Sequence, residues 1–156
     1  MSRSNRYKGN KDKCDGGGFA KLPLSVLNGR AYLSASAHAR MLLLDLAAQY
    51  RGENNGDLSA AWSQMQARGW KSKETLFKAK TELIALGLIV ETRKGARPNK
   101  ASLYACTWMA LDHCGGKLEI GPQSFPRGAY KLQEPIPLSL LKNTGLRTAG
   151  VPRRPP

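Results

Sequence analysis

The sequence predicts a mainly α-helical fold with a small antiparallel β-hairpin, an α+β arrangement, and three features of residues 59–108 lead to this prediction. The first is a helical segment, residues 72–86, whose apolar residues recur at three- and four-residue steps. The second is a shorter helical segment that precedes it across a turn. The third is a pair of β-prone runs, residues 88–93 and 101–108, joined by a polar loop. This order predicts a helix-turn-helix followed by a β-hairpin wing.

The N-terminal part of the chain is expected to supply an arm and a supporting helix. Residues 1–18 are basic and polar and end in three glycines, which predicts a flexible arm. Pro23 suits the start of a short helix over residues 24–27. The next helical segment, residues 36–50, should have Ser34 or Ser36 as its N-cap and a wide apolar stripe for the core.

The two helices of the predicted pair have recognisable ends. Leu58 is expected to form a short strand that joins the hairpin, and Ser59 is expected to cap a helix over residues 60–68. Gly69 would supply the bend between the helices, with Trp70 packed beneath it. The second helix should begin at the N-cap Ser72 and end at Gly87, where a residue with positive φ is favoured. Its apolar stripe consists of Leu76, Ala79, Leu83 and Leu86.

The charge balance favours a polyanionic partner. The chain has 25 Lys and Arg against 11 Asp and Glu, a net charge of +14, and nucleic acid is the commonest partner of such a chain. Residues 22–58 hold three cations and three acids, whereas residues 59–114 hold nine cations and four acids. The helical period turns Glu74, Lys78, Thr81 and Ala85 outward, puts Lys73 and Phe77 on the shoulders, and leaves Lys80 nearer the packed side.

The loop between the two β-prone runs, residues 94–100, has three cations and no acid. Folding gives no reason for this charge, but a wing along a phosphate backbone does. An ordinary soluble loop is the alternative interpretation. We therefore predict double-stranded DNA as the partner.

Five segments of residues 19–112 carry a family resemblance. They are FAKLPLSVLNGRAY at 19–32, NNGDLS at 54–59, RGW at 68–70, EL…GLI at 82–89 and SLYACTW at 102–108. In these segments the chain resembles the winged-helix proteins encoded by proteobacterial phages, prophages and other mobile elements. More distantly, it resembles the N-terminal domains of the replication O proteins of lambdoid phages.

The resemblance implies a transcriptional regulator or an origin-binding replication protein, located in the bacterial cytoplasm and associated with the nucleoid. It implies that the second helix supplies the base contacts, from Lys73, Thr75, Lys78 and Thr81. The turn and the wing would supply the contacts to the DNA backbone, from Lys71, Ser72, Arg93, Lys94, Arg97 and Lys100. Glu74 departs from an all-basic reading face. It could accept a hydrogen bond from a cytosine amino group, or simply cap the helix dipole.

The sequence contains no constellation that predicts catalysis, a metal site or a cofactor. Cys106, His113 and Cys114 lack the paired spacing of zinc ligands, and Cys106 is expected to be a small core residue. Residues 16–18 are glycines without a following Lys–Ser/Thr, so they form no phosphate loop. We therefore expect a protein that is not an enzyme and that uses neither metal nor cofactor.

The cysteine count and the hydropathy predict a cytoplasmic protein. Three cysteines, an odd number, argue against a disulfide scaffold and for a reducing compartment. No apolar run reaches the length of a membrane span, and the polar N-terminus is unlike a signal peptide.

The tail and the function leave alternatives open. We expect a domain over residues 19–114 and a basic, Gly/Pro-rich tail over residues 115–156 that is mostly disordered. Alternatively, Tyr130–Leu141 docks on a protein partner or folds back on the domain. A homodimer on a repeated DNA site is compatible with the first hypothesis. The second hypothesis is a non-catalytic protein-interaction module that uses the same fold to hold a partner.

Overall fold

The computed structural model describes residues 16–132, so the expectations for the N-terminal arm up to residue 15 and for residues 133–156 lie outside it. Its elements in chain order are α1 (Leu24–Leu27), α2 (Arg30–Ser34), α3 (Ala37–Ala47), β1 (Leu58–Ser59), α4 (Trp62–Ala67), α5 (Lys73–Ala85), β2 (Ile89–Arg93), β3 (Leu103–Cys106), and the short 3-10 helices η2 (Cys114–Gly116) and η3 (Ala129–Leu132). The predicted α+β class is confirmed. None of the helices in the described chain is long and apolar enough to cross a membrane.

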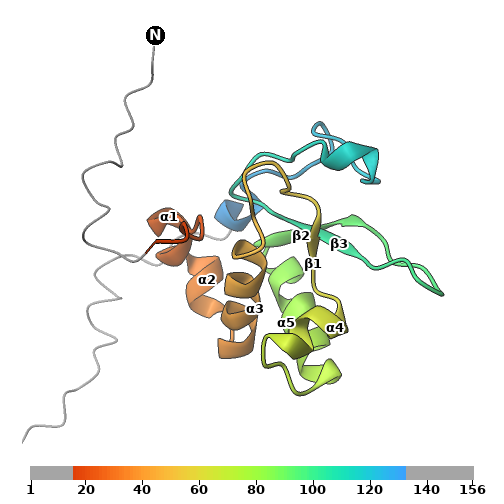
Figure 1. The fold of residues 1–156 in the computed structure, drawn as a ribbon. Helices are drawn as coiled ribbons and strands as arrows, with labels where there is room; N and C mark the ends of the chain where they lie inside the picture. The colour runs from red at the N-terminus through yellow and green to blue at the C-terminus, as the bar shows by residue number, and fades with distance from the viewer. Residues whose placement is uncertain (1–15, 133–156) are drawn as a thin grey trace, which may run out of the picture.

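The strands form one antiparallel sheet in the order β1-β3-β2. Leu58 pairs with Tyr104, which confirms the prediction that Leu58 adds a short strand to the hairpin. Ile89 pairs with Cys106, and the register shifts between Glu91 and Arg93. The far ends of β2 and β3 continue into a loop that projects beyond the helices in Figure 1.

The core lies between α3, α5 and the sheet. Leu42, Leu43 and Leu46 of α3 are fully buried, as the apolar stripe of that segment predicts. From α5, Leu76, Ala79 and Leu83 enter the same cluster, so the predicted stripe of this helix faces the core as expected. Because α3 and α5 bury their apolar stripes against each other, the opposite side of α5 is turned outward.

The ends of α5 follow the predicted signals. The hydroxyl oxygen of Ser72 accepts a hydrogen bond from the backbone N–H of Thr75 at 3.3 Å, which confirms Ser72 as the N-cap. Gly87 has a φ of +70° one residue after the C-cap. A side chain at Gly87 would also collide with Ala129, because an added Cβ would lie 2.9 Å from its backbone. Glycine is therefore required here for conformation and for space.

The predicted ends of α3 and α4 need correction. Ser36 caps α3 as expected, but the helix ends at Ala47 and not at residue 50. The Gln49 side chain instead pairs with the backbone of β1: it accepts from Ser59 N at 2.9 Å and donates to Ser59 O at 2.8 Å. Ser59 is therefore a strand residue, and the N-cap of α4 is Ala61.

A fully buried asparagine joins the loop after α3 to the end of β3. The Asn55 amide donates to the carbonyl oxygens of Cys106 and Ala110 at 3.0 and 2.8 Å, and its oxygen accepts from Cys106 N at 2.8 Å. The backbone N–H of Asn55 donates to the Asp112 carboxylate at 2.8 Å. These bonds hold residues 51–57 against the chain that leaves β3.

The chain after residue 114 returns to the core. Phe125 and Tyr130 are buried, and Gly128 N donates to Thr107 O at 2.8 Å. Of the alternatives left open by the sequence, the burial of Tyr130 fits the one in which this segment folds back on the domain. Packing thus continues at least to Tyr130, past the expected start of the tail at residue 115. The part of the predicted docking segment after Leu132 lies outside the described residues.

We expect Asn55→Ala to lower the free energy of unfolding by on the order of 3 kcal/mol. The reason is that the buried Cys106 N–H and two carbonyl groups would lose their partner without access to water. Urea denaturation followed by circular dichroism measures the change. Asn54→Ala is the control, since Asn54 is half-buried and near solvent. An Asn55→Ala protein as stable as the Asn54→Ala protein would contradict this role.

Candidate functional site

The turn between α4 and α5 is anchored to α3 by one carboxylate. Asp45 is buried on α3, and its two oxygens accept hydrogen bonds from Arg68 Nε at 2.6 Å and from Trp70 Nε1 at 2.8 Å. Trp70 is buried beneath the turn, as predicted. A buried carboxylate needs such partners, and both come from the turn that precedes α5. The start of α5 is thereby fixed relative to α3.

A second link holds the other end of α5. The backbone N–H and the hydroxyl of Ser36, at the start of α3, donate to the Glu82 carboxylate at 2.7 and 2.6 Å. Since Asp45 lies toward the end of α3, the two helices run in opposite directions and are joined near both ends. The outward side of α5, which we define as Glu74, Lys78, Thr81 and Ala85, is exposed along this fixed helix.

The four predicted base-contact residues do not all lie on that outward side. Lys78 and Thr81 do. Lys73 is exposed on the shoulder, with its ammonium 5.8 Å from the centre of the Trp62 ring. Thr75 is half-buried and lies beside Trp70 in a small hollow next to the turn. Lys73, Lys78 and Thr81 are therefore exposed on α5, whereas Thr75 is partly covered next to the turn.

Two of these side chains already have partners within α5. The Lys78 ammonium lies 2.7 Å from Glu74, and both side chains are 74% exposed. An exposed pair of this kind contributes little stability, so Lys78 can exchange Glu74 for another acceptor at a small cost in free energy. The Thr81 hydroxyl donates to the Phe77 carbonyl at 2.9 Å and keeps its oxygen as an acceptor.

The predicted backbone-contact residues lie at the turn and on the hairpin. Lys71 and Ser72 are exposed at the start of α5. Within the hairpin loop (residues 94–100), Ala96 and Lys100 exchange two backbone hydrogen bonds of 2.8 Å, which close its tip. Lys94 and Arg97 are exposed around that tip. Arg93 is half-buried and donates to Ala101 O at 2.9 Å, so its guanidinium is partly used by its own hairpin.

The hairpin loop has an acidic neighbour that its local sequence does not reveal. Glu119 accepts from Lys100 Nζ at 2.8 Å and from the backbone N–H of Lys94 at 3.0 Å. Its own backbone N–H donates to Thr92 O at 2.8 Å, so the segment around Glu119 lies along β2. The hydrogen bond from Lys100, followed by that from Lys94, lowers the pKa of Glu119. The carboxylate therefore stays ionised and offsets one hairpin cation.

An exposed aromatic side chain lies on α5 among residues to which the sequence assigns contacts, but the sequence predicts no role for it. Phe77 was placed on the shoulder of the helix, and its side chain is 61% exposed. The ammonium of Lys80 lies 5.4 Å from the centre of the Phe77 ring and 5.8 Å from that of Tyr104. Lys80 is half-buried, which agrees with its predicted place nearer the packed side. The signal available in the sequence was that Phe77 is a large apolar residue outside the apolar stripe.

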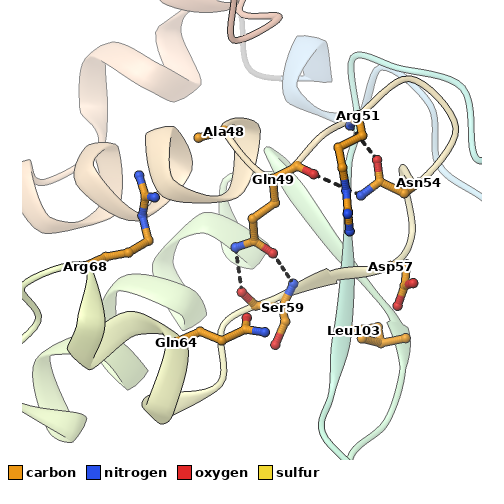
Figure 2. Close-up of a pocket in the computed structure, with 9 residues that line it drawn as sticks. All are labelled: Ala48, Gln49, Arg51, Asn54, Asp57, Ser59, Gln64, Arg68 and Leu103. Atoms are coloured by element: carbon orange, nitrogen blue, oxygen red, sulfur yellow. Dashed lines mark hydrogen bonds between the residues drawn. The ribbon is translucent and has the colours of Figure 1, made fainter. Parts of the chain in front are cut away.

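A polar pocket lies apart from this surface, between the end of α3, β1 and α4 (Figure 2). Its polar groups are largely engaged with the protein itself. Figure 2 shows the Gln49 side chain bonded to the Ser59 backbone. Arg68 is bonded to Asp45, and Asp57 is paired with Lys117 at 2.8 Å. Its lining side chain Gln49 thus holds β1 in place. No nucleophile with a neighbouring base lines this pocket.

In the described part of the chain, the cysteines and the acidic residues give no sign of other chemistry. Burial raises the pKa of the Cys106 thiol to about 12, so this residue is an inert part of the core, as expected. Cys114 is half-buried, and burial raises the pKa of its thiol as well. Within residues 16–132, no three His, Cys, Asp or Glu side chains come together as a metal site.

Comparisons with protein-family models, with curated proteins and with solved structures found no match to this chain. The resemblance drawn from residues 19–112 therefore stays a prediction.

We expect Asp45→Ala to lower the free energy of unfolding by about 3 kcal/mol, because it leaves the buried Trp70 N–H without an acceptor and removes the partner of Arg68. Arg68→Ala is the matched control. Arg68→Ala leaves the Asp45 carboxylate its bond from Trp70 Nε1, so it should cost less than Asp45→Ala, about 1.5 kcal/mol. Urea denaturation of both variants measures the difference. Equal losses would mean that the Trp70 bond contributes little.

Proposed function

We propose that this chain is a winged helix-turn-helix protein that binds double-stranded DNA without catalysing a reaction. The element order α3-β1-α4-α5-β2-β3 and the sheet order β1-β3-β2 support this assignment, since the helix pair α4 and α5 precedes the antiparallel hairpin of β2 and β3. The observation that carries the proposal is the position of α5. It is fixed to α3 near both ends, its outward side is exposed, and the β-hairpin that follows it carries exposed cations in its loop.

The charge of this surface supports a polyanionic partner. Residues 71–100 hold eight Lys and Arg against three Glu. Of the three acids, Glu82 is turned to Ser36, and Glu74 is paired with Lys78. A surface with such an excess attracts DNA by releasing the cations condensed on its phosphates.

Base reading is proposed for the first three turns of α5. A helix in the major groove presents its N-terminal residues to the base edges. Lys78 can donate to guanine O6 and N7, and Glu74 can accept from a cytosine amino group. Thr81 and Lys73 complete the set, whereas Thr75 is too far back for more than a contact at the helix start.

Backbone contacts are proposed for the turn and the wing. Lys71 and Ser72 stand at the start of α5, and Lys94, Arg97 and Lys100 surround the hairpin tip. Arg93 reaches a phosphate only if it gives up its bond to Ala101. These contacts would fix the orientation of the protein on the duplex without reading sequence.

The biological role rests on the family resemblance. It is that of a transcriptional regulator or an origin-binding replication protein of a phage or another mobile element, acting on the bacterial nucleoid in the cytoplasm. A homodimer on a repeated site belongs to the same proposal.

A protein-interaction module is the second candidate, and one observation favours it. Met41 and Leu44 are exposed apolar side chains on α3. A partner that binds through them need not be a polyanion, so its affinity would depend little on salt. Binding to duplex DNA with a steep dependence on salt would decide for the first candidate.

We expect the double variant Lys94→Ala/Arg97→Ala to bind all duplex sequences more weakly and to reduce the slope of log affinity against log salt by about 2. Lys78→Ala should instead relax discrimination between sequences. Gel-shift titrations at several salt concentrations measure both effects. Lys21→Ala/Arg30→Ala is the control: it removes the same charge from the N-terminal segment and α2. If the wing variant binds as the control does, DNA binding by this surface is refuted.

We expect Glu119→Gln to bind duplex DNA more tightly than the wild type, because Lys100 is then released to a phosphate. The slope of log affinity against log salt should become steeper by about 1. Glu53→Gln, an exposed acid in the loop after α3, removes the same charge and is the control. An equal gain in both variants would mean that net charge alone, and not the Lys100 contact, sets the affinity.

A further inference from the structure

Phe77 is an exposed aromatic ring in the middle of a cationic surface. It is the fifth residue of α5 and lies in the half of the helix that would face the bases. Four lysines lie within six residues of it in the sequence, at positions 71, 73, 78 and 80, against Glu74 and Glu82, and the ammonium of Lys80 is 5.4 Å from the ring centre. A single exposed apolar side chain is common on protein surfaces, but this ring lies on the helix proposed to read DNA, where a bound duplex would cover it.

The ring cannot turn into the core. The inner face of α5 at this level is filled by Leu76 and Ala79, which are buried. On the side toward the sheet, the ammonium of Lys80 lies between the rings of Phe77 and Tyr104. The ring is thus held outward by the packing beneath it and by a cation on one side.

The chemistry of the major groove restricts what this ring can contact. Base edges there present hydrogen-bond donors and acceptors, which an aromatic ring cannot satisfy. The one apolar group is the 5-methyl group of thymine. We infer that Phe77 is a specificity-determining residue that packs on a thymine methyl group, so that the preferred duplex carries a thymine at that place. This inference rests on the proposed binding of duplex DNA by α5.

A protein partner is the competing explanation for an exposed ring. Ile84, seven residues later on the same helix, is 41% exposed and would belong to the same docking surface. It lies about 10 Å farther along the helix axis. The four lysines around Phe77 favour the polyanion, and Ile84 provides the control that separates the two explanations.

The experiment compares thymine with deoxyuridine, which lacks only the methyl group. Duplexes selected from a random pool by the full-length protein are resynthesised with deoxyuridine at one thymine at a time. For the wild type, we expect about fourfold weaker binding at one or two positions and little change elsewhere. Phe77→Ala should weaken binding to the thymine duplex and make the scan flat, while its salt slope stays unchanged. Phe77→Leu should keep part of the discrimination, and Ile84→Ala should keep all of it.

The outcomes separate this inference from the proposed function. Duplex binding with a flat scan in the wild type would overturn the role of Phe77 and leave DNA binding intact. An unchanged scan in Phe77→Ala would overturn it as well and point to a protein partner for the ring. An equal loss of discrimination in Ile84→Ala would overturn it because the effect would then not be specific to Phe77. If the full-length protein selects no duplex at all, both the inference and the proposed function fail. Thermal unfolding of each variant checks that the substitutions at these exposed positions leave the fold intact.

Discussion

The arrangement of the surface depends on one buried carboxylate. Asp45 sits on the helix that forms the centre of the core, and both of its partners, Arg68 and Trp70, come from the turn between α4 and α5. Its hydrogen bonds therefore hold the N-terminal end of α5 in position against α3. The link between Ser36 and Glu82 holds the C-terminal end in position. With both ends held and its apolar stripe buried in the core, the rotation of α5 about its axis is determined, and so is the set of side chains that faces outward. The proposed reading of DNA needs that fixed rotation.

Much of this fold is encoded locally and could be predicted. The N-cap at Ser72, the glycine at position 87 and the apolar period between them define α5 to within a residue at each end. Contacts between distant segments could not be predicted in this way. The short helix α2 has no long period, and the burial of Phe125 and Tyr130 comes from a part of the chain whose composition favours disorder. Spacing within a segment carries no information about which distant segment it meets.

The candidate site shows the same division. The helical period correctly predicted that Lys78 and Thr81 face outward, because the apolar stripe determines which face of the helix is buried. It could not predict that Thr75 lies beside Trp70, since the hollow there is formed by the turn before α5 and by α3. The hairpin loop has no acid in its own sequence, yet Glu119 reaches it from beyond β3. The local charge of a loop therefore overstated the charge of the surface around it.

The Gln49 and Glu119 contacts also have a bearing on self-association. In a three-stranded sheet, the two outer strands present unpaired backbone groups that can recruit a strand from another molecule. Here the amide of Gln49 occupies the N–H and the carbonyl of Ser59 on β1, and Glu119 bonds to Thr92 and Lys94 along β2. These contacts engage backbone groups at both outer strands of the sheet. If the chain gathers on DNA as we propose, these contacts leave fewer edge groups through which two sheets could join.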